Sequence, residues 1–217
     1  MSSQPLRLAL ASENAGKLAE FREALAGLPM TLQSAGELGV TDFPEETGAS
    51  YEENALLKAA HVTLKAGLIA LADDSGLEVD ALQGQPGVHT ARFGGPGLTN
   101  GERMAHLLQR LRKVDDALRT ARFVAVIVVA TPGGAVHTFR GESEGRILQG
   151  PRGVGGFGYD PVFFSPELGK SFAEATLEEK RGVSHRGRAL AAFSAWARSA
   201  AGAEQLRLLT PRPVDEE

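Results

Sequence analysis

Apolar residues follow two different periods along the chain, and each period predicts one kind of secondary structure. Over residues 15–28 the apolar positions recur every three or four residues, which is the spacing of one helix face. The same spacing over residues 190–200 predicts a long C-terminal helix. Other helix starts are marked by capping boxes, in which Ser or Thr precedes Glu by three residues: Ser50/Glu53, Thr99/Glu102 and Thr176/Glu179.

Short apolar runs between these segments predict strands. We expect strands at residues 6–12, 68–72 and 77–82, and a hairpin within residues 121–148 that turns at residues 132–134. The chain opens with a strand, a loop and a helix, and the hairpin adds antiparallel strands further along. The sequence therefore predicts an α/β fold in which a mixed β-sheet is flanked by helices.

The composition narrows the class of protein. The 217 residues are 42% hydrophobic and 23% charged, which is typical of a globular protein, and the net charge is −4. An acidic chain argues against a nucleic acid partner, because binding a phosphate backbone needs a basic surface. There is no cysteine for a disulfide or a thiolate metal site. The longest apolar run, residues 123–130, is far shorter than the roughly 18 residues of a membrane helix, so no membrane partner is expected.

These features predict a single cytoplasmic domain over residues 1–217. No repeat, low-complexity block or linker divides the chain, and its start lacks the apolar stretch of a signal peptide. Residues 1–4 and 210–217 are expected to fray.

Two adjacent acidic residues, Asp73 and Asp74, end a predicted strand and precede a Ser-Gly pair. A carboxylate at a strand end in an α/β protein lies where such folds bind ligands. Neighbouring side chains of an extended segment point to opposite faces, so one carboxylate could hold a metal or water while the other forms a cap or pair. Mg²⁺ needs only one or two such carboxylates, and Glu45 and Glu46 offer partners. A simple turn at residues 73–76 is the alternative.

Residues 12–17, with the sequence SENAGK, connect the first predicted strand to the first predicted helix. The start of a helix offers backbone N–H groups and a positive dipole end, so this loop suits a phosphate, with Asn14 and Lys17 as additional donors. The segment matches neither a Walker A motif nor a G-x-G-x-x-G motif. A plain helix cap with a solvated lysine explains it equally well.

Residues 150–161 are rich in glycine, which is entropically costly to order, so we expect something to approach the backbone here. Phe157 and Tyr159 offer aromatic faces for a base. Asp160 precedes Pro161, which makes it an extended, rigid carboxylate. A long loop anchored by two aromatic residues is the alternative.

Cationic side chains gather near the start of the last predicted helix, at Lys180, His185 and Arg186. A guanidinium is a fixed fork of donors that suits a carbonyl, a ring nitrogen or a phosphate. His185 could instead cap the helix, and the four-residue spacing of Asn54 and Lys58 is explained as well by an exposed polar stripe. Taken together, the four segments suggest one site for a nucleotide phosphate and Mg²⁺.

Six ordered blocks of the sequence resemble the inosine triphosphate pyrophosphatase family, the XTP/dITP diphosphatases of non-standard purine nucleotides. The blocks are ASENAGKLAEF, EETGASYEENALLKA, ADDSGLEVDAL, PGVHTARFGG, GGFGYDPVFF and SHRGRAL, and in this order they are spread over nearly the whole length of the chain. The resemblance implies an elongated mixed α/β fold of two lobes with a central substrate cleft, and a homodimer. It also implies Mg²⁺-dependent cleavage of XTP, ITP or dITP to the monophosphate and pyrophosphate.

The same resemblance implies roles for individual residues. Asp74 would accept the proton of the attacking water and bind Mg²⁺, with Glu45 as the second metal ligand. Asp73 and Glu46 are the alternative candidates for these two roles. The residues that would bind substrate are Ser12, Glu13, Asn14, Ala15, Gly16 and Lys17 at the phosphates, with Lys58 as a helper, Ser75, Phe157, Gly158, Tyr159 and Asp160 at the nucleoside, and Lys180, His185 and Arg186 at the purine edge. Arg92 would reach a phosphate or the partner subunit.

Glu13 departs from the pattern, because many relatives carry a small or basic residue there. An acid beside a triphosphate would be repulsive, so its side chain should point away or meet the metal.

Two other functions fit the same residues. A related diphosphatase could act on modified pyrimidine nucleotides, and a panel of triphosphates would separate the two activities. A non-catalytic nucleotide sensor would bind ITP without forming product. Intact Asp74, Glu45 and Lys17 count against the sensor.

Overall fold

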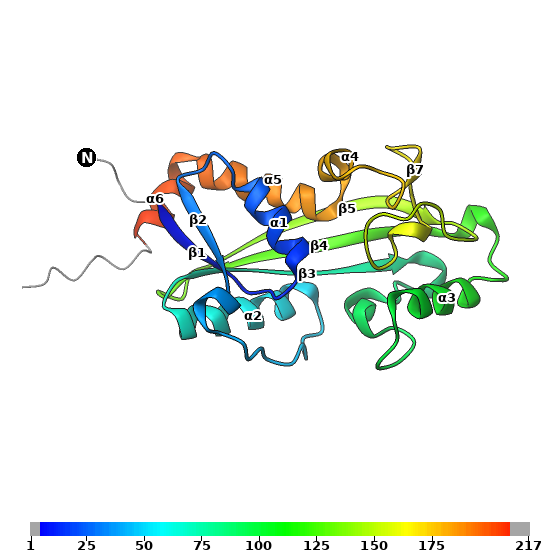
Figure 1. The fold of residues 1–217 in the computed structure, drawn as a ribbon, viewed down its shortest axis with the longest axis horizontal. Coiled ribbons are helices and arrows are strands. Elements are labelled where there is room, and N and C mark those ends of the chain that lie inside the picture. The colour runs from blue at the N-terminus through cyan, green and yellow to red at the C-terminus, as the bar shows by residue number, and fades with distance from the viewer. Residues whose placement is uncertain (1–4, 209–217) are drawn as a thin grey trace, which may run out of the picture. The chain divides into compact units, whose positions relative to one another are not determined.

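The computed structural model describes residues 5–208, and the termini expected to fray lie outside this range. Seven strands form one sheet in the order β2-β1-β3-β4-β5-β6-β7 (Figure 1). The strands are β1 (Leu6–Leu10), β2 (Met30–Ser34), β3 (Ile69–Val79), β4 (Thr120–Ala130), β5 (Val136–Ile147), β6 (Phe163–Ser165) and β7 (Lys170–Ser171). The α-helices are α1 (Ala15–Ala24), α2 (Tyr51–Ala66), α3 (Asn100–Arg110), α4 (Leu177–Val183), α5 (His185–Arg198) and α6 (Ala200–Leu208).

The sheet is mixed, as predicted. β1 pairs in parallel with β2 and with β3, whereas β6 pairs antiparallel with β5 and with β7. The predicted hairpin is confirmed as the neighbouring strands β4 and β5, with Gly134 in the turn at a φ of 82°. The α/β class expected from the sequence is therefore correct.

By its internal contacts the chain separates into two compact units. The first comprises the residues up to Asp74, Val126–Phe139 and the residues from Leu190 on, and the second comprises Ser75–Ala125 and Arg140–Ala189. The strands β3, β4 and β5 and the helix α5 contribute residues to both units.

The first unit is built on β1, α1 and α2. Leu8 and Leu10 of β1 and Phe21 of α1 are fully buried. The helices α1 and α2 lie on opposite sides of the sheet (Figure 1). α2 begins where the Ser50 hydroxyl accepts the N–H of Glu53, and it is capped at its end by Gly67, whose φ is 65°. The start matches the sequence prediction, and each cap satisfies backbone groups that the helix itself leaves unpaired.

An aromatic core holds the second unit together. The ring of Phe123 lies 4.6 Å from that of Phe163 and 5.9 Å from that of Phe172, measured between centroids. The imidazole of His185 stacks on the ring of Phe123, with 4.8 Å between the two centroids. The first residue of α5 is thereby fixed to the core.

One prediction that matters for the site was wrong. The sequence suggested two separate strands at residues 68–72 and 77–82, with a simple turn at 73–76 as the alternative for the acidic pair, but β3 runs unbroken from Ile69 to Val79. Asp73 and Asp74 therefore lie inside a strand. The turn-forming residues of this segment are overridden by pairing within the sheet, which outweighs local preference.

Other elements also differ from the prediction. The strand β2 and the short strands β6 and β7 were not expected, because they are too short to show a clear alternation. The long C-terminal helix is divided at Ser199 into α5 and α6. Among the helices within residues 5–208, none is both long and apolar enough to cross a bilayer.

Gly141 of β5 sets how closely α5 approaches the sheet within the second unit. A Cβ atom at this position would collide with the backbone of His185 and Ala189. We expect Gly141→Ala to lower the free energy of unfolding by about 1–3 kcal/mol through overpacking. At Gly150 an added Cβ would meet no atom within 4 Å, so Gly150→Ala is the control and should change stability by less than about 0.5 kcal/mol. Urea unfolding measures both, and equal midpoints would refute this account of the packing.

Candidate functional site

The centre of the first unit's polar cluster is Asp73, at the point where the neighbouring strand β1 stops. Leu10, the last residue of β1, is opposite Leu71, so β1 ends before it reaches Asp73. The backbone carbonyl of Asp73 instead accepts hydrogen bonds from two lysines, at 3.3 Å from Lys17 Nζ and 3.1 Å from Lys58 Nζ. Such an edge beyond a parallel strand is where α/β sheets bind ligands.

The carboxylate of Asp73 pairs with α1. Its Oδ2 lies 2.7 Å from Lys17 Nζ, and the side chain of Asp73 is fully buried. Only 17% of the Lys17 side chain is exposed, so the alternative of a solvated lysine is wrong.

The carboxylate of Asp74 pairs with α2. Asn54 Nδ2 donates to its Oδ2 at 3.2 Å, and Lys58 Nζ lies 3.5 Å from its Oδ1. The Lys58 ammonium also donates to Glu46 Oε1 at 2.6 Å. Adjacent side chains of β3 thus contact helices on opposite sides of the sheet, as strand alternation requires.

Asn54 and Lys58 are buried, so the alternative that they form an exposed polar stripe is wrong. They occupy the inward face of α2 together with apolar residues: Tyr51, Ala55, Ala59 and Val62. A polar pair within an apolar stripe was the signal in the sequence that could have identified them, since buried polar groups require partners.

The electrostatics of the cluster raise the pKa of Asp74. Burial raises the pKa of Asp74 and the charge of Glu46 raises it further, while Lys58, the Asn54 hydrogen bond and Lys17 act in the opposite direction. Burial alone would lower the pKa of Lys58, but the charges of Asp74, Glu46 and Asp73 outweigh it, and the net effect is a raised pKa. A carboxylate whose pKa is raised is a stronger base, so it is better suited to accept a proton.

The donor set suits a hard cation. Within residues 5–208 no three acidic or histidine side chains gather as a metal cluster. Mg²⁺ does not require one, because it binds one or two carboxylates and completes its shell with water and substrate phosphates. Asp74 and Glu46 repel each other, and a cation is favourable beside them, as the Lys58 ammonium shows at 3.5 Å and 2.6 Å from their oxygens. Glu45, the predicted second ligand, is exposed on the loop that also carries Glu46.

The predicted phosphate-binding residues lie at the start of α1. The Asn14 side chain accepts the N–H of Lys17 at 3.1 Å, and the Ser12 hydroxyl accepts the N–H of Asn14 at 3.2 Å. No acidic side chain lies in the first helical turn, which leaves the positive end of the dipole uncompensated there. Ala15 and Gly16 form this turn, and Glu13 before it is exposed.

The predicted nucleoside residues lie in the second unit, and they differ in exposure. Phe157 is 43% exposed, whereas Tyr159 and Asp160 are buried. The Tyr159 hydroxyl donates to the Thr90 carbonyl at 3.4 Å, and burial raises its pKa to about 12. Of the two aromatic rings, Phe157 is therefore the one open to a ligand.

The glycines of this loop are explained by the chain itself. Added Cβ atoms at Gly153 and Gly155 would meet the backbone of Ala173, and one at Gly156 would collide with Asp160. Close approach to the backbone is thus confirmed, but the approaching groups belong to the protein. Gly158, with a φ of 62°, has no such neighbour within 4 Å.

The three predicted purine-edge cations are all buried. Lys180, in α4, lies 2.5 Å from Asp160 Oδ2, measured from its Nζ. Arg186 of α5 donates to the Ser75 hydroxyl at 3.2 Å. Arg92 is exposed, and its guanidinium lies 3.0 Å from the Nδ1 of His89.

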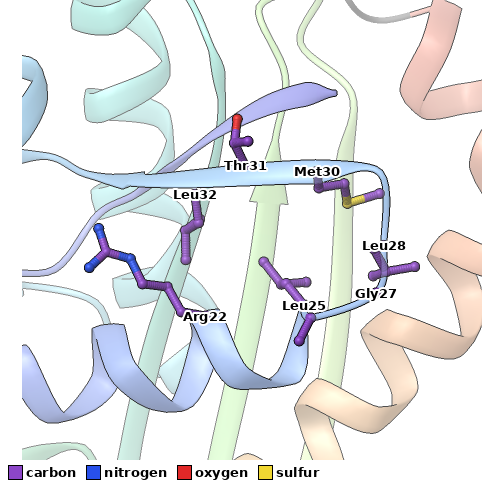
Figure 2. A pocket seen from close by; sticks show the side chains of 8 residues that line it. Arg22, Leu25, Gly27, Leu28, Met30, Thr31 and Leu32 are labelled. Carbon is purple, nitrogen blue, oxygen red and sulfur yellow. The ribbon is translucent and has the colours of Figure 1, made fainter. Parts of the chain in front are cut away.

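A separate pocket of about 320 Å³ lies beside the end of α1 and β2 (Figure 2). It is lined by Arg22, Leu25, Ala26, Gly27, Leu28, Met30, Thr31 and Leu32. None of the residues predicted to bind substrate belongs to it, so it is not the candidate site.

Comparisons with known proteins agree with the six sequence blocks. The Ham1 family matches residues 8–196. A dITP/XTP pyrophosphatase of Deinococcus deserti is 53% identical over 189 residues, which are 87% of this chain and 88% of that protein. Another from Thermus thermophilus is 53% identical over 188 residues, covering 87% and 90%. A solved HAM1 protein from Coxiella burnetii superposes with a TM-score of 0.82 at 42% identity, covering 88% and 97%.

The two adjacent aspartates should respond oppositely to amidation. Because the folded state raises the pKa of Asp74, folding favours its protonated form, and stability falls as pH rises through the folded pKa. Asp74→Asn should therefore stabilise the protein at pH 7 by about 1 kcal/mol, and this gain should shrink at lower pH. Asp73→Asn breaks the buried pair with Lys17 and should cost about 3 kcal/mol.

Urea unfolding in metal-free buffer at several pH values measures both variants. Equal losses of stability in the two variants would show that the described electrostatics are incorrect.

Proposed function

The chain belongs to the Ham1 family, and we propose that it hydrolyses non-standard purine nucleoside triphosphates, XTP, ITP and dITP, to the monophosphate and pyrophosphate. The observation that carries this proposal is the cluster on β3, in which Lys17 and Lys58 meet at the Asp73 carbonyl beside the carboxylate of Asp74. It combines cations for a triphosphate with a base for water. Relatives that share half of the sequence are named dITP/XTP pyrophosphatases, which supports the same substrate class.

Asp74 acts as the proton acceptor in the proposed reaction. A water oxygen forms a bond to the α-phosphorus, the bond from that phosphorus to the bridging oxygen breaks, and pyrophosphate leaves. The carboxylate of Asp74 takes the proton of the water, for which its buried position and raised pKa are suited. Lys17, Lys58 and the backbone N–H groups at the start of α1 hold the phosphate oxygens.

Mg²⁺ is the proposed cofactor, held by Asp74 together with Glu46 or Glu45. When bound, it would neutralise phosphate charge and increase the electrophilicity of the phosphorus. Glu46 is favoured because Lys58 contacts both Glu46 and Asp74, which brings the two carboxylates to the same ammonium. Glu45 was the expectation from the sequence. The homodimer and the cytoplasmic location stay predictions.

The purine is proposed to stack on Phe157, with His185 and Arg186 facing its edge. Hypoxanthine and xanthine carry an oxygen at position 6, which accepts a hydrogen bond from a guanidinium. Adenine carries an amino group there and would place donor against donor. A buried donor left without an acceptor is costly, so the oxo bases are favoured.

A direct assay combines ITP with the wild type and two asparagine variants. We expect wild-type protein to release IMP and pyrophosphate in a 1:1 ratio, and only when a divalent cation is present. Asp74→Asn should lower turnover by roughly 10²-fold or more, the usual scale for losing a positioned base. Asp42→Asn makes the same change at an exposed residue outside the cluster and should leave turnover unchanged. Release of inorganic phosphate instead of pyrophosphate would refute the proposed reaction.

Base selectivity follows from the residues that are proposed to contact the purine. We expect kcat/KM for ITP to exceed that for ATP by at least about 10²-fold, because only the oxo base satisfies the donors at the purine edge. Steady-state kinetics with the two nucleotides, measured at the same metal concentration, give the ratio. Comparable values for ATP and ITP would exclude this explanation of selectivity.

A further inference from the structure

Asp160 and Lys180 form a nearly inaccessible ion pair in the second unit. The distance from Lys180 Nζ to Asp160 Oδ2 is 2.5 Å, and 9% and 3% of the two side chains are exposed. Removing two charges from water costs about as much as their attraction returns, so a buried pair is weak evidence for a role in stability alone. The other contacts of each residue indicate a different role.

Asp160 shapes the turn that carries Phe157. Its Oδ2 accepts the backbone N–H of Phe157 at 2.8 Å, and its own N–H donates to the Phe157 carbonyl at 3.2 Å. Gly156, with a φ of 70°, makes room for this carboxylate, because a side chain there would collide with it. The position of Phe157 is thus set by a buried carboxylate three residues further on.

Lys180 links the exposed ring to the core. Its ammonium lies 5.0 Å from the centroid of Phe157 and 5.4 Å from that of Phe172. Phe172 is 1% exposed and fixed in the aromatic core, whereas Phe157 is 43% exposed. A cation within about 6 Å of an aromatic centroid is attracted to the ring. The guanidinium of Arg186 adds a second cation, 5.8 Å from the Phe157 centroid.

We propose that Asp160 and Lys180 are positioning residues, which hold the ring of Phe157 as a platform for the purine. Lys180 then acts on the base through this ring and not by a hydrogen bond to the purine edge. The inference rests on the proposed function, since the stacked group is the purine of the nucleoside triphosphate. Selectivity for the 6-oxygen is then assigned to Arg186 and His185. Lys180 contributes equally to the binding of every purine.

The decisive comparison uses Lys180→Met with two substrates, ITP and purine riboside triphosphate, which lacks the 6-oxygen. Loss of the ring's support should weaken both substrates by about the same factor, near 10-fold, with KM rising and kcat nearly unchanged. The ratio of the two kcat/KM values should stay within about 2-fold of the wild-type ratio. If Lys180 instead contacts the 6-oxygen, only ITP will be weakened and the ratio will collapse, which overturns the inference.

A pair of glycine variants tests the turn independently of the lysine. Gly156→Ala displaces the Asp160 carboxylate, and it should raise KM for both substrates as Lys180→Met does. Gly169→Ala has the same left-handed strain, at a φ of 67°, but its added Cβ meets no atom within 4 Å. It should therefore retain the wild-type KM, with thermal unfolding confirming that both variants fold. Equal KM values in the two variants would overturn the role of Asp160.

The outcomes separate this inference from the proposed function. If wild-type protein fails to cleave ITP, the proposed function is wrong. If the wild type is active but Lys180→Met loses activity only toward ITP, the function stands and the positioning role is rejected.

Discussion

The site depends on one interaction, the convergence of two lysines on the backbone carbonyl of Asp73. It exists because β1 stops opposite Leu71, so the next residues of β3 are available to side chains from α1 and α2. The lysine ammoniums are each held by a carboxylate as well, at 2.7 Å in Lys17 and 2.6 Å in Lys58. The two ammonium groups are therefore held at the strand edge, and in the proposed site this would reduce the cost of ordering them on a triphosphate.

The residues proposed to bind the base are also held in place by contacts within the protein. Phe157 is exposed enough to stack on a purine, yet its backbone and ring are tied to the buried Asp160 and Lys180. His185 is stacked on Phe123 of the core. Ligand-binding groups are thus supported by side chains that are themselves packed, so the ring and the cations adopt one arrangement. In the proposed complex, a ring held in this way would stack on a flat purine at little cost in conformational freedom.

Sequence patterns were most informative where local physics decides structure. The capping box at Thr99 and the caps of α2 follow from backbone groups that any helix leaves unpaired, so they could be recognised in short segments. The continuous strand through Asp73 and Asp74 could not, because it depends on pairing with neighbours that are distant in sequence. The partnership of Asn54 and Lys58 with β3 was missed for the same reason. It is visible only once α2 is seen to bury that face.

The family resemblance indicated candidate residues for the site, but the contacts among these residues are visible only in the structure. In the sequence, Asp160 and Lys180 cannot be distinguished from residues that contact substrate. Their contacts with each other and with Phe157 suggest that they act through this ring. Glu45 and Glu46 are adjacent residues of the same type, so the sequence does not distinguish them. Among the contacts of residues 5–208, only Glu46 of the two reaches Lys58. Adjacent residues on a loop can differ completely in direction, which no composition or spacing reveals.

The most direct test of the central claim is a crystal structure of the Asp74→Asn variant with ITP and Mg²⁺. The account predicts phosphate oxygens within about 3 Å of Lys17 Nζ, Lys58 Nζ and the backbone N–H groups that open α1. It also predicts the α-phosphorus beside residue 74. A triphosphate bound away from β3, with both lysines still engaged only by Asp73 and Glu46, would contradict it.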